Sequence, residues 1–192
     1  MYLNQIQGIS LTLFTLFLMS VSLFGQVNND YKLVISYDKD SNKTTVFLPL
    51  KELPNNSDSF SVGAFFEFKG KKQKEMPCCV GILFKSASRE NFKYKDNHNL
   101  TIWADNEKME FSKITWRESP EGFALIVAKI AFLEDMLAAI KADQFFTIAN
   151  SKKVEMQIGD FKFNLTDSQL QGFQNLADKM KNFAGNKERN SR

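Results

Sequence analysis

The chain is poor in the residue types that carry most recognisable chemistry. Its 192 residues include one histidine, two cysteines, four prolines and nine glycines. A structural zinc site needs four ligands, commonly in spaced pairs, and two adjacent cysteines with one distant histidine are a poor match. The sparse glycines form neither a phosphate-binding loop nor a dinucleotide fingerprint, and no G-x-S-x-G nucleophile elbow is present. These absences predict no cofactor and no metal, and they favour a non-enzymatic protein.

A strong charge imbalance is also lacking. The formal net charge is +3 with both signs interspersed along the chain, which is ordinary surface chemistry, so we expect no nucleic-acid partner. Phenylalanine, by contrast, is abundant at 19 residues. A chain of this length and apolar content is predicted to be globular and to bury its core without disulfide bonds.

The longest uncharged apolar run lies near the start of the chain, from Ile9 to Phe24. A membrane-spanning helix needs about 20 apolar residues, whereas the core of a signal peptide has about 7–15 and ends at small residues. Ser20, Ser22 or Gly25 can supply the small residue at the cleavage site. We therefore predict a signal peptide over residues 1–25 and an exported protein, periplasmic or secreted. An uncleaved N-terminal anchor is the alternative, because no Lys or Arg precedes the run.

The remainder of the chain has no second long apolar run, so no transmembrane span is expected in the mature protein. Residues 26–185 are predicted to form one β-rich domain, and residues 186–192 a flexible tail. Alternating apolar residues predict strands over residues 31–37, 43–48, 60–68, 78–84, 100–104, 109–116, 123–130, 154–158 and 161–165. Turns are predicted at 39–42, 105–106, 119–122 and 159–160, and loops at 49–58 and 86–99. Because strands and helices do not alternate regularly, the pattern favours an antiparallel β-sandwich or open barrel.

Two helices are predicted near the C-terminal end. The first covers residues 132–142, where four apolar residues recur at helical spacing: Leu133, Met136, Leu137 and Ile140. The segment 145–149 is ambiguous between helix and strand. The second helix begins after Thr166, whose side chain can form a capping box with Gln169. It is predicted to be amphipathic and to end at Gly185, with one apolar stripe comprising Leu170, Phe173, Leu176, Ala177, Met180 and Phe183.

Residues 146–180 have a recognisable layout. A short helix leads to a lysine, an alternating strand, a Gly159–Asp160 turn, a strand ending at Leu165, and the capped helix. This layout resembles the C-terminal end of small exported β-sandwich proteins of bacteria, mostly uncharacterised, including the invasion-associated locus B type of periplasmic protein. The resemblance implies a β-sandwich and an exported location, and it implies no activity and no site residues.

Cys78 and Cys79 are adjacent, so in a strand their side chains point to opposite faces. A disulfide between them needs a strained peptide bond. We expect both to be reduced, with Cys78 facing the core beside Val80 and Ile82. A vicinal disulfide and an intermolecular bond through Cys79 are the alternatives.

The one dense basic cluster follows the strand predicted to end at Phe68. It contains Lys71, Lys72 and Lys74, beside Lys69. One interpretation is a solvated turn, whose charges discourage edge-to-edge pairing of strands. The functional interpretation is a binding site for an anionic surface, a lipid head group or an acidic glycan, or for another envelope protein.

Other polar candidates are weaker. His98, the only histidine, is expected to be a solvated loop residue, although a hydrolase with an unrecognised site remains an alternative. The acidic pairs Asp38/Asp40 and Glu134/Asp135 could be interpreted as a glycosidase dyad or a calcium site, but any chain with 22 acids contains such pairs. Another alternative is a lipid or small apolar ligand inside the β-fold, lined by the inward-facing Phe60, Phe66, Phe68, Phe84 and Phe111.

Overall fold

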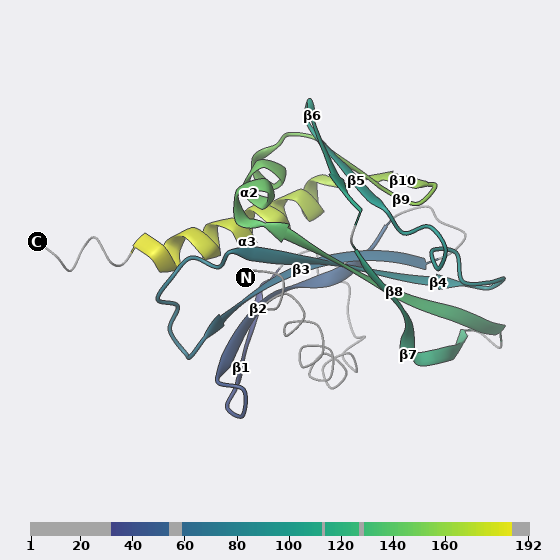
Figure 1. The fold of residues 1–192 in the computed structure, drawn as a ribbon, viewed down its shortest axis with the longest axis horizontal. Coiled ribbons are helices and arrows are strands. Elements are labelled where there is room, and N and C mark those ends of the chain that lie inside the picture. Colours follow the sequence, from purple (N-terminus) through teal and green to yellow (C-terminus); the bar gives the residue numbers. More distant parts are fainter. Residues whose placement is uncertain (1–31, 54–58, 113, 127–128, 186–192) are drawn as a thin grey trace, which may run out of the picture. The chain divides into compact units, whose positions relative to one another are not determined.

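The computed structural model describes residues 32–53, 59–112, 114–126 and 129–185 (Figure 1). The predicted signal peptide, the tail 186–192 and the middle of the loop around Pro54 lie outside the described residues. Within the described part the protein is mainly β, with two antiparallel sheets and two helices. The prediction of a mainly β, antiparallel fold is therefore confirmed at this level.

The larger sheet has six strands, because each successive apolar segment pairs with a neighbour in antiparallel register. Its spatial order is β1 (Val34–Asp38), β2 (Lys43–Glu52), β3 (Ser59–Lys69), β4 (Cys79–Ser88), β8 (Lys129–Lys141) and β7 (Thr115–Ile126). The smaller sheet has four strands, in the order β10 (Phe161–Asn164), β9 (Val154–Ile158), β5 (Leu100–Ala104) and β6 (Glu107–Phe111). The strands β5 and β9 have the bounds that alternation predicts.

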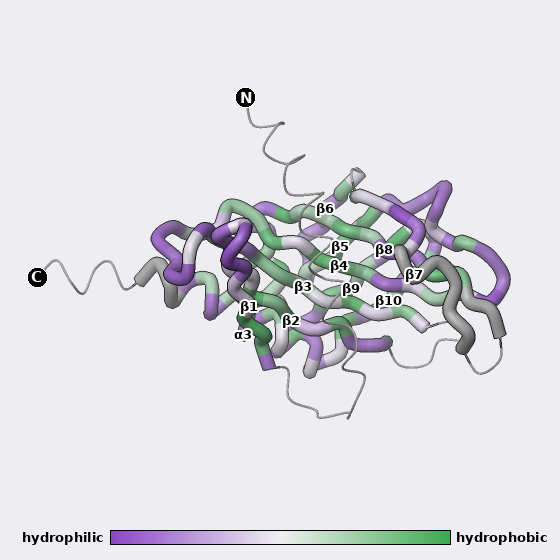
Figure 2. Tube along the Cα trace, turned by 90° about the horizontal axis from the view of Figure 1, so that it is seen from below, coloured by the Kyte–Doolittle hydropathy of each residue, from purple (hydrophilic) through white to green (hydrophobic). Residues whose placement is uncertain are grey.

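The two helices, α2 (Ala142–Asn150) and α3 (Asp167–Gly185), lie on the same side of the larger sheet as the smaller sheet does (Figure 1). Phe60 of β3 contacts Phe161 and Phe163 of β10, with ring centroids 5.0 and 5.4 Å apart. Phe145 of α2 lies 5.6 Å from Phe173 of α3. One apolar core thus joins both sheets and both helices, and the hydrophobic stretches run along the central strands (Figure 2).

The predicted start of α3 is confirmed in detail. The Thr166 N–H donates to Gln169 Oε1 at 2.9 Å, and the Gln169 N–H donates back to Thr166 Oγ1 at 3.2 Å. This reciprocal capping box supplies partners for two donors, one of them an N–H that the first turn of a helix cannot satisfy internally. The apolar residues predicted on the helix are buried as far as Met180.

The helix predicted over residues 132–142 is wrong, because that segment is most of strand β8. β8 lies between β4 and β7, and its residues 133–136 are buried on both faces, so this stretch lacks a simple alternation. Its apolar spacing therefore imitates a helix. The true helix begins at Ala142, just after Lys141, and includes the ambiguous segment 145–149.

The turn predicted at residues 119–122 is also wrong. Strand β7 continues from Thr115 to Ile126, with a register shift between Glu118 and Phe123. Proline is tolerated here because β7 is an edge strand, where one side needs no ladder hydrogen bond.

Four other predicted boundaries change as well. The predicted strand 109–116 is divided between β6 and β7, and the run 123–130 between β7 and β8. β2 continues past Pro49 through a register shift, and β4 continues to Ser88.

Candidate functional site

The predicted binding lysines lie in the connection between β3 and β4, at the end of the larger sheet that also carries the β1–β2 turn (Figure 1). Lys71, Lys72 and Lys74 are all exposed. We call residues 70–78 the basic connection. A backbone that holds these lysines in place lowers the conformational entropy lost on binding, so the hydrogen bonds that anchor the connection are described next.

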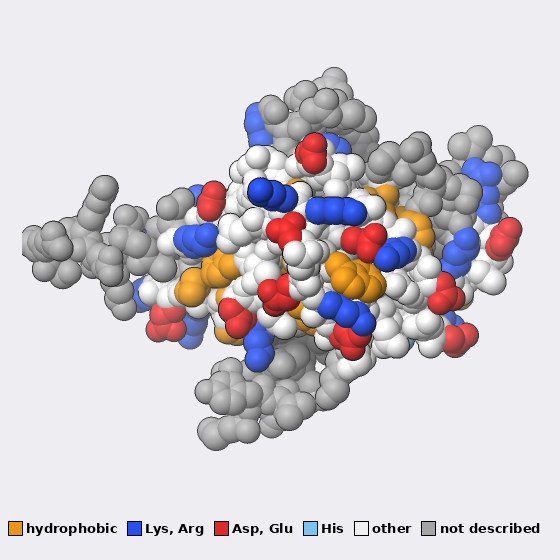
Figure 3. Space-filling model, turned by 90° about the horizontal axis from the view of Figure 1, so that it is seen from above, with side chains coloured by type: hydrophobic (Ala, Val, Ile, Leu, Met, Phe, Trp, Pro, Cys, Tyr) orange, Lys and Arg blue, Asp and Glu red, His pale blue; other side chains and the backbone are white. Residues whose placement is uncertain are grey.

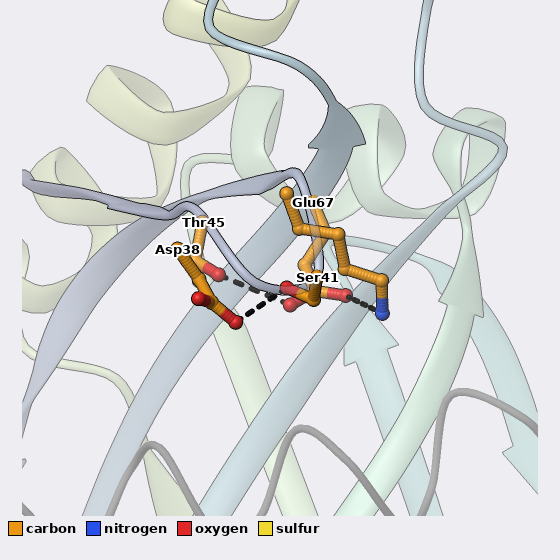
Figure 4. Close-up of polar contacts among 5 residues, drawn as sticks. Asp38, Ser41, Thr45 and Glu67 are labelled. Carbon is orange, nitrogen blue, oxygen red and sulfur yellow. Dashed lines mark hydrogen bonds and ion pairs between the residues drawn. The ribbon is translucent and has the colours of Figure 1, made fainter.

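The β1–β2 turn is the first element that holds the backbone of the basic connection. The Asp38 carboxylate accepts a hydrogen bond from Ser41 Oγ (Figure 4). It also accepts one from the Asp40 N–H at 2.9 Å. The Ser41 bond and then the Asp40 bond hold the pKa of Asp38 below its ordinary value. Asn42 closes the turn with φ of 50°, a left-handed conformation that asparagine tolerates. The predicted turn at 39–42 is therefore a hydrogen-bonded unit.

Gly70 joins the basic connection to this turn. Its N–H donates to Asn42 O at 2.7 Å, and its carbonyl accepts from Thr44 Oγ1 at 2.6 Å. Its φ of 80° lies in the left-handed region, where a side chain is strained. Both polar groups of the Gly70 backbone are thus held by neighbouring residues of the β1–β2 hairpin.

Gln73 anchors the middle of the connection. It is only 7% exposed, although it lies between exposed lysines. Its Nε2 donates to Glu75 O at 2.9 Å and to Met180 O of α3 at 3.5 Å. At the far end, the Ala142 N–H donates to Cys78 O at 2.9 Å. The connection is therefore attached to β1–β2, to α3 and to the start of α2.

Glu67, an acid near the start of the basic connection, already has partners within the sheet. Glu67 receives Lys43 Nζ at 3.3 Å and Thr45 Oγ1 at 3.0 Å (Figure 4). Lys71 Nζ lies 5.1 Å from the centre of the Tyr37 ring, within the range of a cation–π contact. Across the described ranges, no ion pair to a carboxylate involves Lys71, Lys72 or Lys74. The basic connection thus presents three exposed lysines that form no ion pair with a described acid, together with one exposed acid, Glu75.

The side of the molecule over the smaller sheet and the helices is different. Figure 3 shows Lys, Arg, Asp and Glu side chains mixed over this face. Several of them pair with each other, such as Lys162 with Glu155 at 2.7 Å. Such a mixed surface creates no field of one sign.

A second polar cluster, which the sequence analysis did not identify, surrounds Glu134 on β8. Glu134 is fully buried, and its carboxylate accepts from the N–H groups of Lys93 at 2.9 Å and Tyr94 at 2.8 Å. Trp116 Nε1 donates to the same carboxylate at 2.9 Å. The charge is therefore used to hold the β4–β5 connection against the sheet. The only sequence signal was an acid inside a long apolar segment.

The two acids of the pair Glu134/Asp135 have separate partners. Asp135 follows Glu134 in the strand and pairs with Arg117 at 3.3 Å. Burial lowers the pKa of Arg117 to about 10, against the opposing effect of Asp135, so the guanidinium stays charged at neutral pH. In the described part of the chain, no three Asp, Glu, His or Cys side chains are grouped so that they could hold a metal ion.

His98 is half-buried and is not fully solvated as predicted. Its Nδ1 lies 3.0 Å from Tyr94 O, and because a carbonyl can only accept, Nδ1 carries the proton. The ring therefore helps to fold the β4–β5 connection back on itself.

The expected inward orientation of Cys78 is wrong. β4 begins at Cys79, so Cys78 lies before the strand and is exposed, whereas Val80 and Ile82 do face the core as predicted. Both cysteines are free thiols. Burial, followed by the hydrogen bond with Cys78, raises the pKa of Cys79 to about 11. Cys79 is thus a protonated thiol at neutral pH.

The inward phenylalanines pack against other rings. Phe60, Phe66 and Phe84 are fully or almost fully buried, and Phe60 contacts Phe84 and Tyr94 at centroid distances of 6.1 and 5.6 Å. Phe68 and Phe111 are partly buried against the core. These side chains thus belong to the apolar core, where they contact other rings and core residues.

Comparison with protein-family models, with curated proteins and with solved structures gives no match. No helix in the described ranges is both long and apolar enough to cross a membrane.

Proposed function

We propose that the protein is exported and that its β-rich domain is a non-enzymatic binding module for an anionic partner. The observation that supports binding is the basic connection. Its three exposed lysines form no ion pair with a described acid, and hydrogen bonds from neighbouring elements hold its backbone. Anchoring matters because a preorganised site loses less conformational entropy on binding than a flexible one.

The export part of the proposal rests on the apolar run from Ile9 to Phe24 and on the small residues after it. Native mass spectrometry of the protein from its own source tests it. A chain that begins near Gln26 or Val27 supports export through a cleaved signal peptide. A chain that begins at Met1 overturns cleavage.

The finer architecture belongs to the same proposal. We infer that the smaller sheet and the two helices pack on the core face of the larger sheet as a β-sandwich in which helices replace part of the second layer. The helix α3 is then amphipathic, since its described buried residues recur at helical spacing.

The anionic partner we favour is a surface of anionic lipid, because such a surface needs only clustered cations. Lysines near such a surface each contribute about 1 kcal/mol, so three contribute about 3 kcal/mol, or more than ~100-fold in affinity. The triple variant K71E/K72E/K74E should therefore lose binding to vesicles that contain anionic phospholipid. Salt should weaken the binding of the unmodified protein, since exposed charges are screened.

The matched control is K95E/K152E/K153E, which makes the same change in net charge at exposed lysines outside the basic connection. It should retain most of the binding. Equal loss in both triple variants would show that only net charge matters, and would overturn the basic connection as the site. Binding to acidic glycan but not to vesicles would change the partner and keep the site.

The two alternatives, an apolar ligand within the fold and a hydrolase, gain no specific support. The inward rings contact each other, and His98 Nδ1 is bonded to a backbone carbonyl.

A further inference from the structure

The two sheets end in four edge strands, and three of these carry features that oppose pairing with another chain. β7 contains Pro120 and a register shift. β6 carries Glu107, Lys108 and Glu110, and β10 has only four residues, with Lys162 exposed. Proline, bulges, charges and short length are the usual means by which edge strands avoid edge-to-edge association.

The fourth edge, β1, has no proline and no register shift, and its one charged residue is Asp38 at its end. Its sequence is VISYD, and within the described ranges it pairs only with β2. Val34 and Ile35 are 50% and 53% exposed. In the described part of the chain, the only other exposed large hydrophobic side chain is that of Met76, at 51%. β1 therefore offers both an open backbone ladder and apolar side chains, which is the combination that another strand can cover.

We propose that β1 pairs antiparallel with β1 of a second copy of this chain, in the register that places Ile35 opposite the partner's Ile35. If the pairing extends over the two residues that precede β1, this register also places Lys32 opposite the partner's Asp38 and Leu33 opposite the partner's Tyr37. By symmetry each of these two pairs forms twice, as in any two-fold interface.

The positions of the charged and apolar side chains favour this register over its neighbour. Shifting the centre to Ser36 would move Asp38 opposite the partner's Val34, which loses the ion pair and places a carboxylate beside an apolar side chain. With Ile35 at the centre, opposite charges face each other, and aromatic and aliphatic side chains face each other. Both kinds of cross-strand pair are favourable.

The side of the sheet also fits. Ile35 is opposite Val46 of β2, and Val46 is opposite Phe66 of β3, so Ile35 extends a row that belongs to the core side of the sheet. Leu33 packs against the same core. Pairing would continue this apolar row from one copy into the next, while Lys32 and Asp38 would meet on the other side of the sheet.

The axis would pass between the two β1 strands, level with Ile35, so the two basic connections would lie at opposite ends of the joined sheet. The proposed dimer does not require an anionic partner, although Tyr37, which would face the partner's Leu33, also contacts Lys71 of the basic connection. An extended segment of a different protein is the competing occupant of this edge, and the experiment separates the two.

The test measures the association state of the mature protein by sedimentation velocity over a range of concentrations. We expect a reversible dimer for the unmodified chain and at least ~10-fold weaker association for I35K, because two like charges would face each other across the axis. The control A139K introduces the same charge at an exposed apolar residue of the inner strand β8, away from the β1 edge, and should dimerise normally. A protein that stays monomeric at all concentrations, or an I35K variant that dimerises normally, overturns the proposal.

Cross-linking tests the register without relying on I35K. In a chain with C78S and C79S, the single variants I35C and S36C are oxidised and compared. Directly opposite residues have Cβ atoms about 4.5–5.5 Å apart, close to the reach of a disulfide, so I35C should form the covalent dimer faster. Faster cross-linking through S36C overturns this register, and no cross-linking in either variant overturns pairing through β1.

Discussion

Two strand connections in this protein are held by similar hydrogen bonds but leave their charges in opposite places. The β4–β5 connection is held by Glu134, whose buried carboxylate accepts from Lys93 N, Tyr94 N and Trp116 Nε1. The basic connection is held by neutral groups, namely Asn42 O, Thr44 Oγ1 and the Gln73 amide. In the first the charge is the anchor, and in the second the charges remain in solvent.

This difference separates a structural polar cluster from a binding candidate. A buried carboxylate that accepts several hydrogen bonds is costly to disturb, and it has little capacity left for a ligand. Exposed lysines on a separately anchored backbone can change partners without unfolding the protein. Substitution of the buried carboxylate should therefore change stability, substitution of the lysines should change binding, and only substitution of an anchor of the basic connection should change both.

The largest expected effect is at Glu134. E134A removes the acceptor of three hydrogen bonds in the interior, so the free energy of unfolding should fall by about 3–5 kcal/mol in a urea titration. E134Q keeps one carbonyl oxygen and the side-chain volume, so its free energy of unfolding should lie between those of E134A and the unmodified protein.

The matched control is E110Q, at an exposed carboxylate that pairs with Lys108. The stability of this variant should change by less than about 0.5 kcal/mol. A stability loss in E134A no larger than in E110Q would show that the carboxylate does not hold the connection.

A smaller effect is expected at the anchor of the basic connection. T44V removes the hydroxyl that donates to Gly70 O, and it should cost about 1 kcal/mol of stability. Amide exchange at residues 70–74 should rise, and anionic vesicle binding should fall about 2–5-fold, because the lysines would lose part of their preorganisation.

T45V is the comparison for this variant. It also removes a hydroxyl donor, but one that bonds to Glu67 within the sheet. Amide exchange in the basic connection should therefore stay unchanged in T45V. Equal exchange in both variants would mean that the Thr44–Gly70 bond is not an anchor.

The smallest effect concerns reactivity rather than stability. At pH 8 an alkylating reagent should modify Cys78 first, because it is exposed, while Cys79 reacts slowly. Since the pKa of Cys79 is raised to about 11, its rate should increase as the pH approaches that value. Mass spectrometry of the modified peptides measures both rates, and equal rates at pH 8 would contradict the burial of Cys79.

Secondary structure could be predicted from the sequence where a strand is buried on one face only, or where a turn or cap is held by its own side chains. The strands at 100–104 and 154–158, the turn at 39–42 and the Thr166 cap all follow from alternation, turn residues or capping pairs. Prediction failed in β7 and β8, because the neighbours of a strand decide whether its residues are buried on one face or two. The role of Glu134 also depended on contacts with residues about 40 positions away.

The sequence by itself therefore determined that the chain is mainly β, where α3 begins and which lysines cluster, because these depend on residues close together in the chain. It also provides the apolar N-terminal run on which the export proposal rests. Only the tertiary structure decided which strand is central and which is an edge, which acid is buried, and which groups anchor the basic connection. Those properties are set by segments far apart in sequence, whose pairing no local pattern contains.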